Sequence, residues 1–238
     1  MEHLEAAHYA DPLGYQAAAE GRGEAMFASR LDLITRHRAP GRLLDVGCGK
    51  GEFLSVARTR GWAVAGIEPS QGLCEHARAA YGLDVRLGTL ETAGAEAAAF
   101  DAVTLNHVLE HVERPLELLR GARGLLKPDG LLFVEVPNCD SYLLRAADAY
   151  FRLRGLDWSS RLSPLHPPFH RFGFTVASLL HALRAAGLEP VELVTYSGKG
   201  RGYRGGRGLA AVMRGAAAAL LDLLPNRELL AALARPLR

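Results

Sequence analysis

One stretch decides the fold: Leu43-Leu-Asp45-Val-Gly47-Cys-Gly49-Lys-Gly51-Glu-Phe-Leu54. It begins as an apolar run of strand length, continues through three alternate glycines and passes directly into a helical pattern. Glycine lets the backbone turn tightly and lets a ligand approach closely. In open α/β sheets the ligand crevice lies at the carboxyl ends of the strands, near the point where the strand order reverses. The stretch therefore predicts a strand, a ligand-binding loop and a helix.

Working outward, apolar runs bounded by Gly, Pro or charge alternate with helical patterns along the chain. The predicted strands are Arg42 to Val46, Ala63 to Ile67, Asp84 to Leu87, Ala102 to Leu105, Leu131 to Val136 and Val191 to Tyr196. Helices are predicted at Gly51 to Arg60, Gln71 to Tyr81, Pro115 to Leu126 and Thr175 to Ala186. This alternation predicts an α/β fold with a Rossmann-like, doubly wound and mostly parallel sheet. Residues 228–235 favour helix by propensity, but they follow a Pro-Asn turn and are predicted as a last antiparallel strand.

Composition excludes several classes of protein. The chain has 238 residues, of which 49% are hydrophobic and 23% charged, and its formal net charge is only +2. Nucleic acid is therefore not the expected partner. The three cysteines, Cys48, Cys74 and Cys139, form no C-x-x-C pair for zinc or redox chemistry. No leader is readable at the start, and residues 208–224 are too short and too interrupted to span a membrane, so a cytoplasmic protein is expected.

The glycine spacing limits the ligand. Counted from Gly47, a dinucleotide-binding G-x-G-x-x-G/A fingerprint needs Gly or Ala at position 52, where the chain has Glu52. This argues against a nicotinamide dehydrogenase. The next predicted strand leads to Glu68, whose carboxylate can accept hydrogen bonds from two ribose hydroxyls. A nucleoside without phosphate is expected.

These residues resemble the class I S-adenosylmethionine-dependent methyltransferases, in their broad small-molecule branch. The family motif D-x-G-x-G-x-G is present as Asp45, Gly47, Gly49 and Gly51. The resemblance extends over about positions 40 to 137, in the family's order, through 66–70, 88–90, 100–101, 106–111 and 126–130. It implies S-adenosyl-L-methionine as the cofactor.

The resemblance also implies the cofactor site. The glycine loop would hold the methionyl part, Glu68 the ribose, and the backbone of Thr89 and Leu90 the adenine edge. Thr89 stands where many relatives carry an acidic residue, which weakens the adenine assignment alone. The full expected set of cofactor-binding residues is Asp45, Gly47, Cys48, Gly49, Gly51, Glu68, Pro69, Thr89, Leu90, Asn106 and His107.

A second motif, His107-Val-Leu-Glu110-His111, matches the H-x-x-E-H pattern of a class of zinc peptidases. Zinc ligands four residues apart need a continuous helix, yet this segment directly follows a predicted strand and Pro115 comes soon after. No third ligand is identifiable from the sequence, so no metal site is predicted. His107 is expected to face the transferred methyl group or to be hydrogen-bonded in a turn, and His111 is expected to be structural.

The acceptor side is expected in the aperiodic segment between the fifth strand and the last predicted helix. Residues 167–175 resemble a segment of one broad methyltransferase branch in which a histidine precedes aromatic residues and a helix start. The candidate bases for a weakly acidic acceptor are His107, His166 and His170. A set of aromatic side chains either walls an apolar acceptor pocket or forms a small core of its own: Trp158, Phe169, Phe172 and Phe174.

Four segments are predicted. Residues 1–40 form a helical cap, 41–137 the cofactor-binding core, 138–174 a substrate-side insertion, and 175–238 complete the core sheet with a C-terminal helix. The predicted function is transfer of a methyl group by in-line displacement from S-adenosylmethionine to an O, N or C atom of a small molecule, in a monomer or homodimer. The alternatives are an RNA or protein methyltransferase that uses the basic loop 199–208, and a non-catalytic S-adenosylmethionine-binding module.

Overall fold

The computed structural model describes residues 23–156, 170–196 and 227–237. Its centre is a seven-stranded sheet of order β3-β2-β1-β4-β5-β7-β6. Neighbouring strands from β3 to β5 pair in parallel, and β7 runs antiparallel to both β5 and β6. The strands are β1 Arg42–Val46, β2 Ala63–Glu68, β3 Val85–Leu87, β4 Phe100–Asn106, β5 Leu126–Pro137, β6 Leu188–Tyr196 and β7 Leu229–Pro236. The predicted Rossmann-like sheet with its last antiparallel strand is confirmed.

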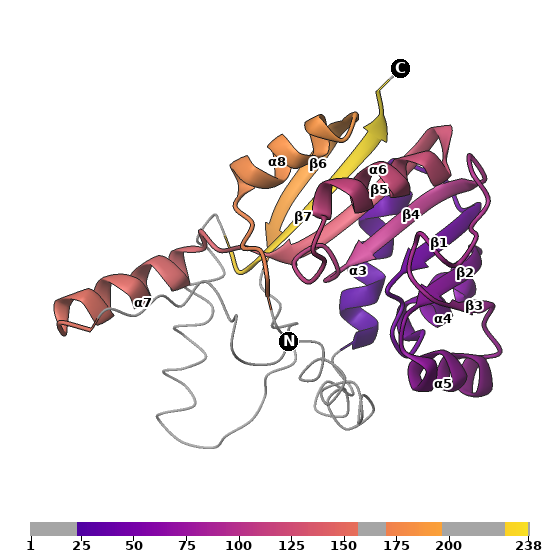
Figure 1. Ribbon diagram of the computed structural model, residues 1–238, viewed down its shortest axis with the longest axis horizontal. Coiled ribbons are helices and arrows are strands. Elements are labelled where there is room, and N and C mark those ends of the chain that lie inside the picture. The colour runs from indigo at the N-terminus through magenta and orange to yellow at the C-terminus, as the bar shows by residue number, and fades with distance from the viewer. Residues whose placement is uncertain (1–22, 157–169, 197–226, 238) are drawn as a thin grey trace.

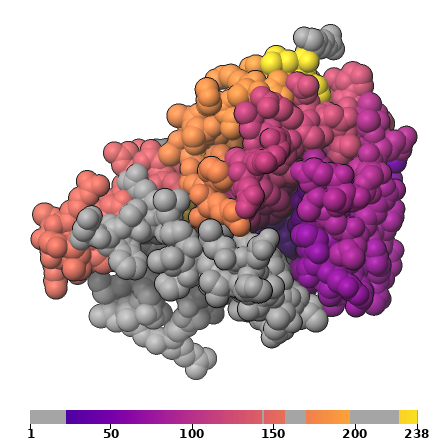
Figure 2. Space-filling model, viewed as in Figure 1, coloured from indigo at the N-terminus to yellow at the C-terminus, as the bar shows by residue number. Residues whose placement is uncertain are grey.

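Helices cover both faces of the sheet (Figure 1). The helices of the described chain are α3 Gly23–Thr35, α4 Glu52–Thr59, α5 Gln71–Tyr81, α6 Pro115–Leu125, α7 Tyr142–Leu153 and α8 Val176–Ala185, and all but α7 pack against the sheet. Buried side chains of α3, α4 and α5 form one apolar cluster with the sheet, and those of α6 and α8 form another. Figure 2 views the second face, on which α8 and α6 lie next to each other. The sheet is therefore packed on both sides, as its nearly continuous apolar strands require.

Strand β7 replaces the helix that its composition favours. Residues 230–234 are almost completely buried, and β7 lies between β5 and β6 with hydrogen-bonded neighbours on both edges. Pairing and burial on both faces outweigh the modest helical preference of Ala and Leu. The described residues beyond α8, 186–196 and 227–237, contain no C-terminal helix, and the apolar stretch 208–224 lies outside the described residues.

The clearest differences from the prediction are in β5 and α7. Strand β5 begins at Leu126, five residues early, because Leu126 pairs with Phe100 ahead of a register shift in β4. Helix α7 was not predicted within 138–174. Its N-cap is Ser141, whose side-chain oxygen accepts a hydrogen bond from the Leu144 N–H, and the helix is strongly amphipathic.

The segment that holds α7 leaves and rejoins the sheet at one place. Asn138 and Phe174 form an isolated parallel bridge, and the Cys139 N–H donates to the Phe174 carbonyl at 2.8 Å. Helix α7 extends away from the sheet at this end (Figure 1). In the described part of the chain, no helix has both the length and the apolar character needed to cross a membrane.

Candidate functional site

The glycine loop connects the carboxyl end of β1 to α4. Gly47, Gly49 and Gly51 have φ angles of 74°, 55° and 83°, in the left-handed region that favours glycine. A Cβ on Gly47 would lie 2.6 Å from Cγ2 of Val108, and a Cβ on Gly51 would lie 2.5 Å from Cδ1 of Leu83. Glycine at 47 and 51 is therefore required both by the backbone conformation and by close packing.

The loop is held against the end of β2. The N–H groups of Gly47 and Cys48 donate to the Ile67 carbonyl at 2.7 and 3.1 Å. The carboxylate of Glu68, only 4% exposed, accepts from the Gly49 N–H at 2.9 Å and from the Ser70 N–H at 3.0 Å. Burial raises the pKa of Glu68, and these two hydrogen bonds oppose that shift. Each carboxylate oxygen accepts one N–H and keeps a further lone pair for a ligand hydroxyl.

A buried, hydrogen-bonded group of polar side chains lies between the carboxyl ends of β1 and β4. Oδ1 of Asp45 accepts from Oγ1 of Thr104 at 2.6 Å and from Nδ2 of Asn106 at 2.9 Å. Burial raises the pKa of Asp45 to about 6 despite these two hydrogen bonds. Within the described chain, Oδ1 of Asn106 is buried and has no hydrogen-bond partner. A buried acceptor without a partner is costly, so it is suited to receive a donor from a ligand.

The end of β3 also reaches this edge. The Gly88 N–H donates to the Glu68 carbonyl at 3.0 Å, which brings the segment that continues into Thr89 and Leu90 close to Glu68 in space. The Thr89 N–H is already bonded to Oγ1 of Thr92 at 2.9 Å. Pro69 is exposed beside Glu68. The adenine-binding role expected of 89–90 stays a prediction.

His107 lies just beyond β4 with a positive φ of 55°. Its Nε2 is 2.8 Å from Oε1 of Glu135, and its Nδ1 is 3.2 Å from Oε1 of Glu110. Burial by itself would lower the pKa of His107, but the hydrogen bonds to the two carboxylates outweigh it and raise the pKa to about 9. At neutral pH the ring is therefore an imidazolium that donates both protons, which is a binding or positioning state rather than that of a base.

Arg30 completes this network from α3. Its Nε donates to Oε2 of Glu135 at 2.9 Å, and its Nη2 contacts Oε1 of the same carboxylate. Both side chains are buried, at 4% and 0% exposure. Sequence reasoning missed Arg30, Glu110 and Glu135 as a connected group. The only local signal was a glutamate inside the predicted apolar strand Leu131 to Val136 and an arginine on an apolar helix face.

A third group lies between the turn after β4 and the segment before α8. Residues 107–111 are not helical, as predicted. The N–H groups of Arg171 and Phe172 donate to the Glu110 carbonyl at 2.8 and 3.2 Å, and the rings of His111 and His170 are 5.0 Å apart. Burial, aided by the nearby His111, lowers the pKa of His170.

This arrangement brings together potential metal-ligating side chains that are far apart in the sequence. Glu110, His111 and His170 each offer one ligand atom, and these atoms lie within 4.8 Å of one another. His170 is thus the third potential ligand that the sequence did not identify. Of the other acceptor-side residues, Phe174 is buried in the main core and Phe172 is exposed, whereas Trp158, His166 and Phe169 lie outside the described residues.

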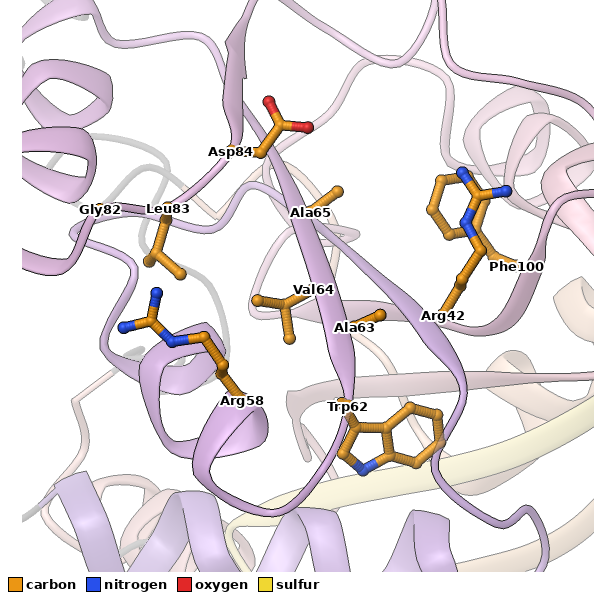
Figure 3. A pocket seen from close by; sticks show the side chains of 10 residues that line it. All are labelled: Arg42, Arg58, Trp62, Ala63, Val64, Ala65, Gly82, Leu83, Asp84 and Phe100. Carbon is orange, nitrogen blue, oxygen red and sulfur yellow. The ribbon is translucent and has the colours of Figure 1, made fainter.

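A cavity of about 450 Å³ lies elsewhere (Figure 3). It contains none of the expected site residues. Three of its lining residues are the first residues of β1, β2 and β4, so it opens at the amino ends of these strands, opposite the glycine loop. The lining residues are Arg42, Arg58, Trp62, Ala63, Val64, Ala65, Gly82, Leu83, Asp84 and Phe100.

Comparison with protein families decides the assignment. Residues 18–193 match a family model described as a methyltransferase domain. The chain belongs to the S-adenosylmethionine-dependent methyltransferases. It is 33% identical over 189 residues to the ubiquinone biosynthesis O-methyltransferase of Ruegeria pomeroyi, covering 68% of this chain and 71% of that one. It is 36% identical over 171 residues to the enzyme of the same name from Xanthomonas campestris pv. campestris, covering 67% and 68%.

Solved structures agree on the fold of this methyltransferase. A possible histamine N-methyltransferase from Thermotoga maritima has a TM-score of 0.67 at 21% identity, covering 99% of both chains. The 1,6-didemethyltoxoflavin-N1-methyltransferase of Burkholderia thailandensis, which holds its acceptor and S-adenosylhomocysteine, has a TM-score of 0.63 at 18% identity, covering 98% of this chain and 85% of that one. The predicted enzyme class and methyl donor, S-adenosylmethionine, are confirmed.

Proposed function

We propose that this methyltransferase acts on a small molecule and transfers the methyl group to an oxygen atom. The O-methyltransferase names of relatives that share 33 to 36% identity support oxygen over nitrogen and carbon. The basic loop 199–208, on which an RNA or protein acceptor depends, lies outside the described residues. No described feature favours that alternative.

The single observation that supports the cofactor site is the cradle at the carboxyl ends of β1, β2 and β4. The positive φ angles of Gly47, Gly49 and Gly51 turn the loop tightly at the end of β1, which lets its backbone lie close to the methionyl part. The unpartnered Oδ1 of Asn106 can accept from an ammonium group, and the spare lone pairs of Glu68 can accept from ribose hydroxyls. Donor and acceptor types thus fit an aminoacyl nucleoside without phosphate.

The bound cofactor supplies an electrophilic methyl carbon on a sulfonium; the acceptor oxygen bonds to it while the carbon–sulfur bond breaks, with the electron pair staying on sulfur. The protein's main contribution is alignment of the two partners. His107 has both ring nitrogens engaged by carboxylates, so its role is to hold the turn at the tip of β4 in position. His170, neutral because burial lowers its pKa, is the better of the two described candidate bases for an acceptor hydroxyl.

The test is methyl transfer from isotopically labelled S-adenosylmethionine to a panel of phenols, catechols and matched aromatic amines, read by mass spectrometry. The proposal expects labelled methyl ethers from at least one hydroxyl acceptor and no product from the matched amine. Methylation of amines alone would overturn the oxygen assignment, and methylation of RNA or protein alone would overturn the small-molecule assignment.

A further inference from the structure

We propose that Glu110, His111 and His170 form a binding site for a divalent transition-metal ion of the Zn²⁺ type on the acceptor side of the enzyme. Two imidazoles and one carboxylate form a ligand set that such ions use in proteins. The three side chains come from two segments that are far apart in the sequence but meet beside the end of β4.

The distances allow the site to close around an ion. Glu110, His111 and His170 each offer one ligand atom, and these three atoms lie within 4.8 Å of one another. Around a tetrahedral ion with bonds of about 2.0 to 2.1 Å, ligand atoms stand about 3.3 Å apart. Closing the cluster to this spacing would require rotation of the two imidazoles, both of which are only partly buried.

Glu110 provides an independent sign of a missing ligand. Its side chain is 1% exposed, and its Oε2 is buried without a hydrogen-bond partner in the described chain. Its Oε1 already accepts a hydrogen bond from Nδ1 of His107. One oxygen of the carboxylate is thus held in place by the protein, and the other is left for a cation, which compensates a buried carboxylate oxygen well.

The surroundings of the cluster hold the ligands in position. His107 is fixed on its other side by Glu135, so it orients Glu110 as outer-shell groups orient ligands in metal sites. The segment that carries His170 is hydrogen-bonded to Glu110, since the N–H groups of Arg171 and Phe172 both donate to the Glu110 carbonyl. His107 itself is not counted as a ligand, because each of its ring nitrogens faces a carboxylate oxygen.

Three protein ligands leave at least one coordination position open, which is typical of catalytic rather than structural zinc sites. If the oxygen acceptor proposed above is correct, its hydroxyl would occupy this position. A metal ion lowers the pKa of a bound hydroxyl. Because His170 would then be a metal ligand and not the base, the proton would pass to solvent water. The site would thereby select acceptors with an oxygen that can bind a metal, such as a catechol. This last step rests on the proposed function, whereas metal binding does not.

The experiment is titration of the chelator-treated full chain, without any affinity tag, with Zn²⁺ by calorimetry and with Co²⁺ by visible absorption. The wild type is expected to bind one ion with the intense d–d bands of a low-coordinate cobalt site. His170→Ala and Glu110→Gln are expected to weaken binding more than about 100-fold, because loss of an outer-shell partner alone costs about 10- to 100-fold. His181→Ala, an exposed histidine on α8, is the matched control and should bind as the wild type does.

Thermal unfolding and circular dichroism verify that each variant is folded, and His170→Gln replaces His170→Ala if the latter is not. Binding that is absent in the wild type, or equally strong in folded His170 variants, would overturn the metal site. Glu68→Gln separates the two proposals, because it is expected to bind Zn²⁺ normally while losing S-adenosylmethionine. If the wild type binds Zn²⁺ in the expected way but methylates only amines, the oxygen assignment fails and the metal site stands.

Discussion

Replacing Arg30 by methionine removes the cation that neutralises Glu135 in the core while keeping much of the side-chain volume. Arg30 is 4% exposed and Glu135 is 0% exposed, so neither charge is solvated. Breaking a buried ion pair from one side costs about 3 to 5 kcal/mol. Because His107 remains as a second partner of Glu135, a loss of about 3 kcal/mol in the free energy of unfolding is expected. For a domain of this size that corresponds to a fall in Tm of roughly 6 to 12 °C.

Urea unfolding and differential scanning calorimetry measure this loss. Arg60→Met is the matched control, because Arg60 pairs with Asp32 at the surface, where the two side chains are 37% and 69% exposed. That variant should lose less than about 1 kcal/mol. In the double variant Arg30→Met/Glu135→Gln, the loss should be smaller than the sum of the two single losses, by about 0.5 to 3 kcal/mol. Equal losses in Arg30→Met and Arg60→Met would refute the reasoning.

Three further predictions concern the glycine loop, the stability of the protein at low pH and the hydrophobic core. Gly47→Ala forces a φ of 74° on a residue with a Cβ that meets Val108, so it should cost at least about 1 to 2 kcal/mol in urea unfolding and abolish cofactor binding in calorimetry. Burial would raise the pKa of Asp101, but hydrogen bonds from Arg38 and Lys127 outweigh burial and hold this pKa well below its usual range. The ionised Asp101 therefore stabilises the fold fully above about pH 4, and this stabilisation is lost as the pH falls further. Urea unfolding of wild type and Asp101→Asn should thus converge in acid, and a constant difference between them would contradict this. Leu183→Ala, at a fully buried position between α8 and the sheet, should lower the free energy of unfolding by about 2 to 5 kcal/mol, and a loss below 1 kcal/mol would show that the position tolerates a cavity.

Local patterns in the sequence predict the sheet and the glycine loop because both depend on short-range rules. Alternating apolar runs and helical periodicity determine the elements, and the glycines of the loop have the positive φ angles that the tight turn requires. Strand β7 was predictable only from its turn and not from its propensity. Its burial between two strands is a tertiary effect.

The polar clusters could not be predicted in the same way. Arg30 and Glu135 are 105 positions apart and meet only because α3 packs against β5. His170 reaches Glu110 through backbone hydrogen bonds between two segments that no local pattern connects. Helix α7 was missed because the prolines and aromatic residues that follow it made the whole segment read as aperiodic.

The most direct test of the central claim is calorimetric titration of the full chain with S-adenosylmethionine and S-adenosylhomocysteine, for the wild type, Glu68→Gln and the control Glu96→Gln. Glu96 is an exposed glutamate paired with Arg42, away from the glycine loop. The cofactor site proposed at the carboxyl ends of β1, β2 and β4 requires one bound ligand in the wild type and the control. It also requires a loss of affinity of at least about tenfold in Glu68→Gln, since a hydrogen bond to a charged group contributes about 1.5 to 3 kcal/mol. Equal affinity in all three proteins would contradict this location of the cofactor site.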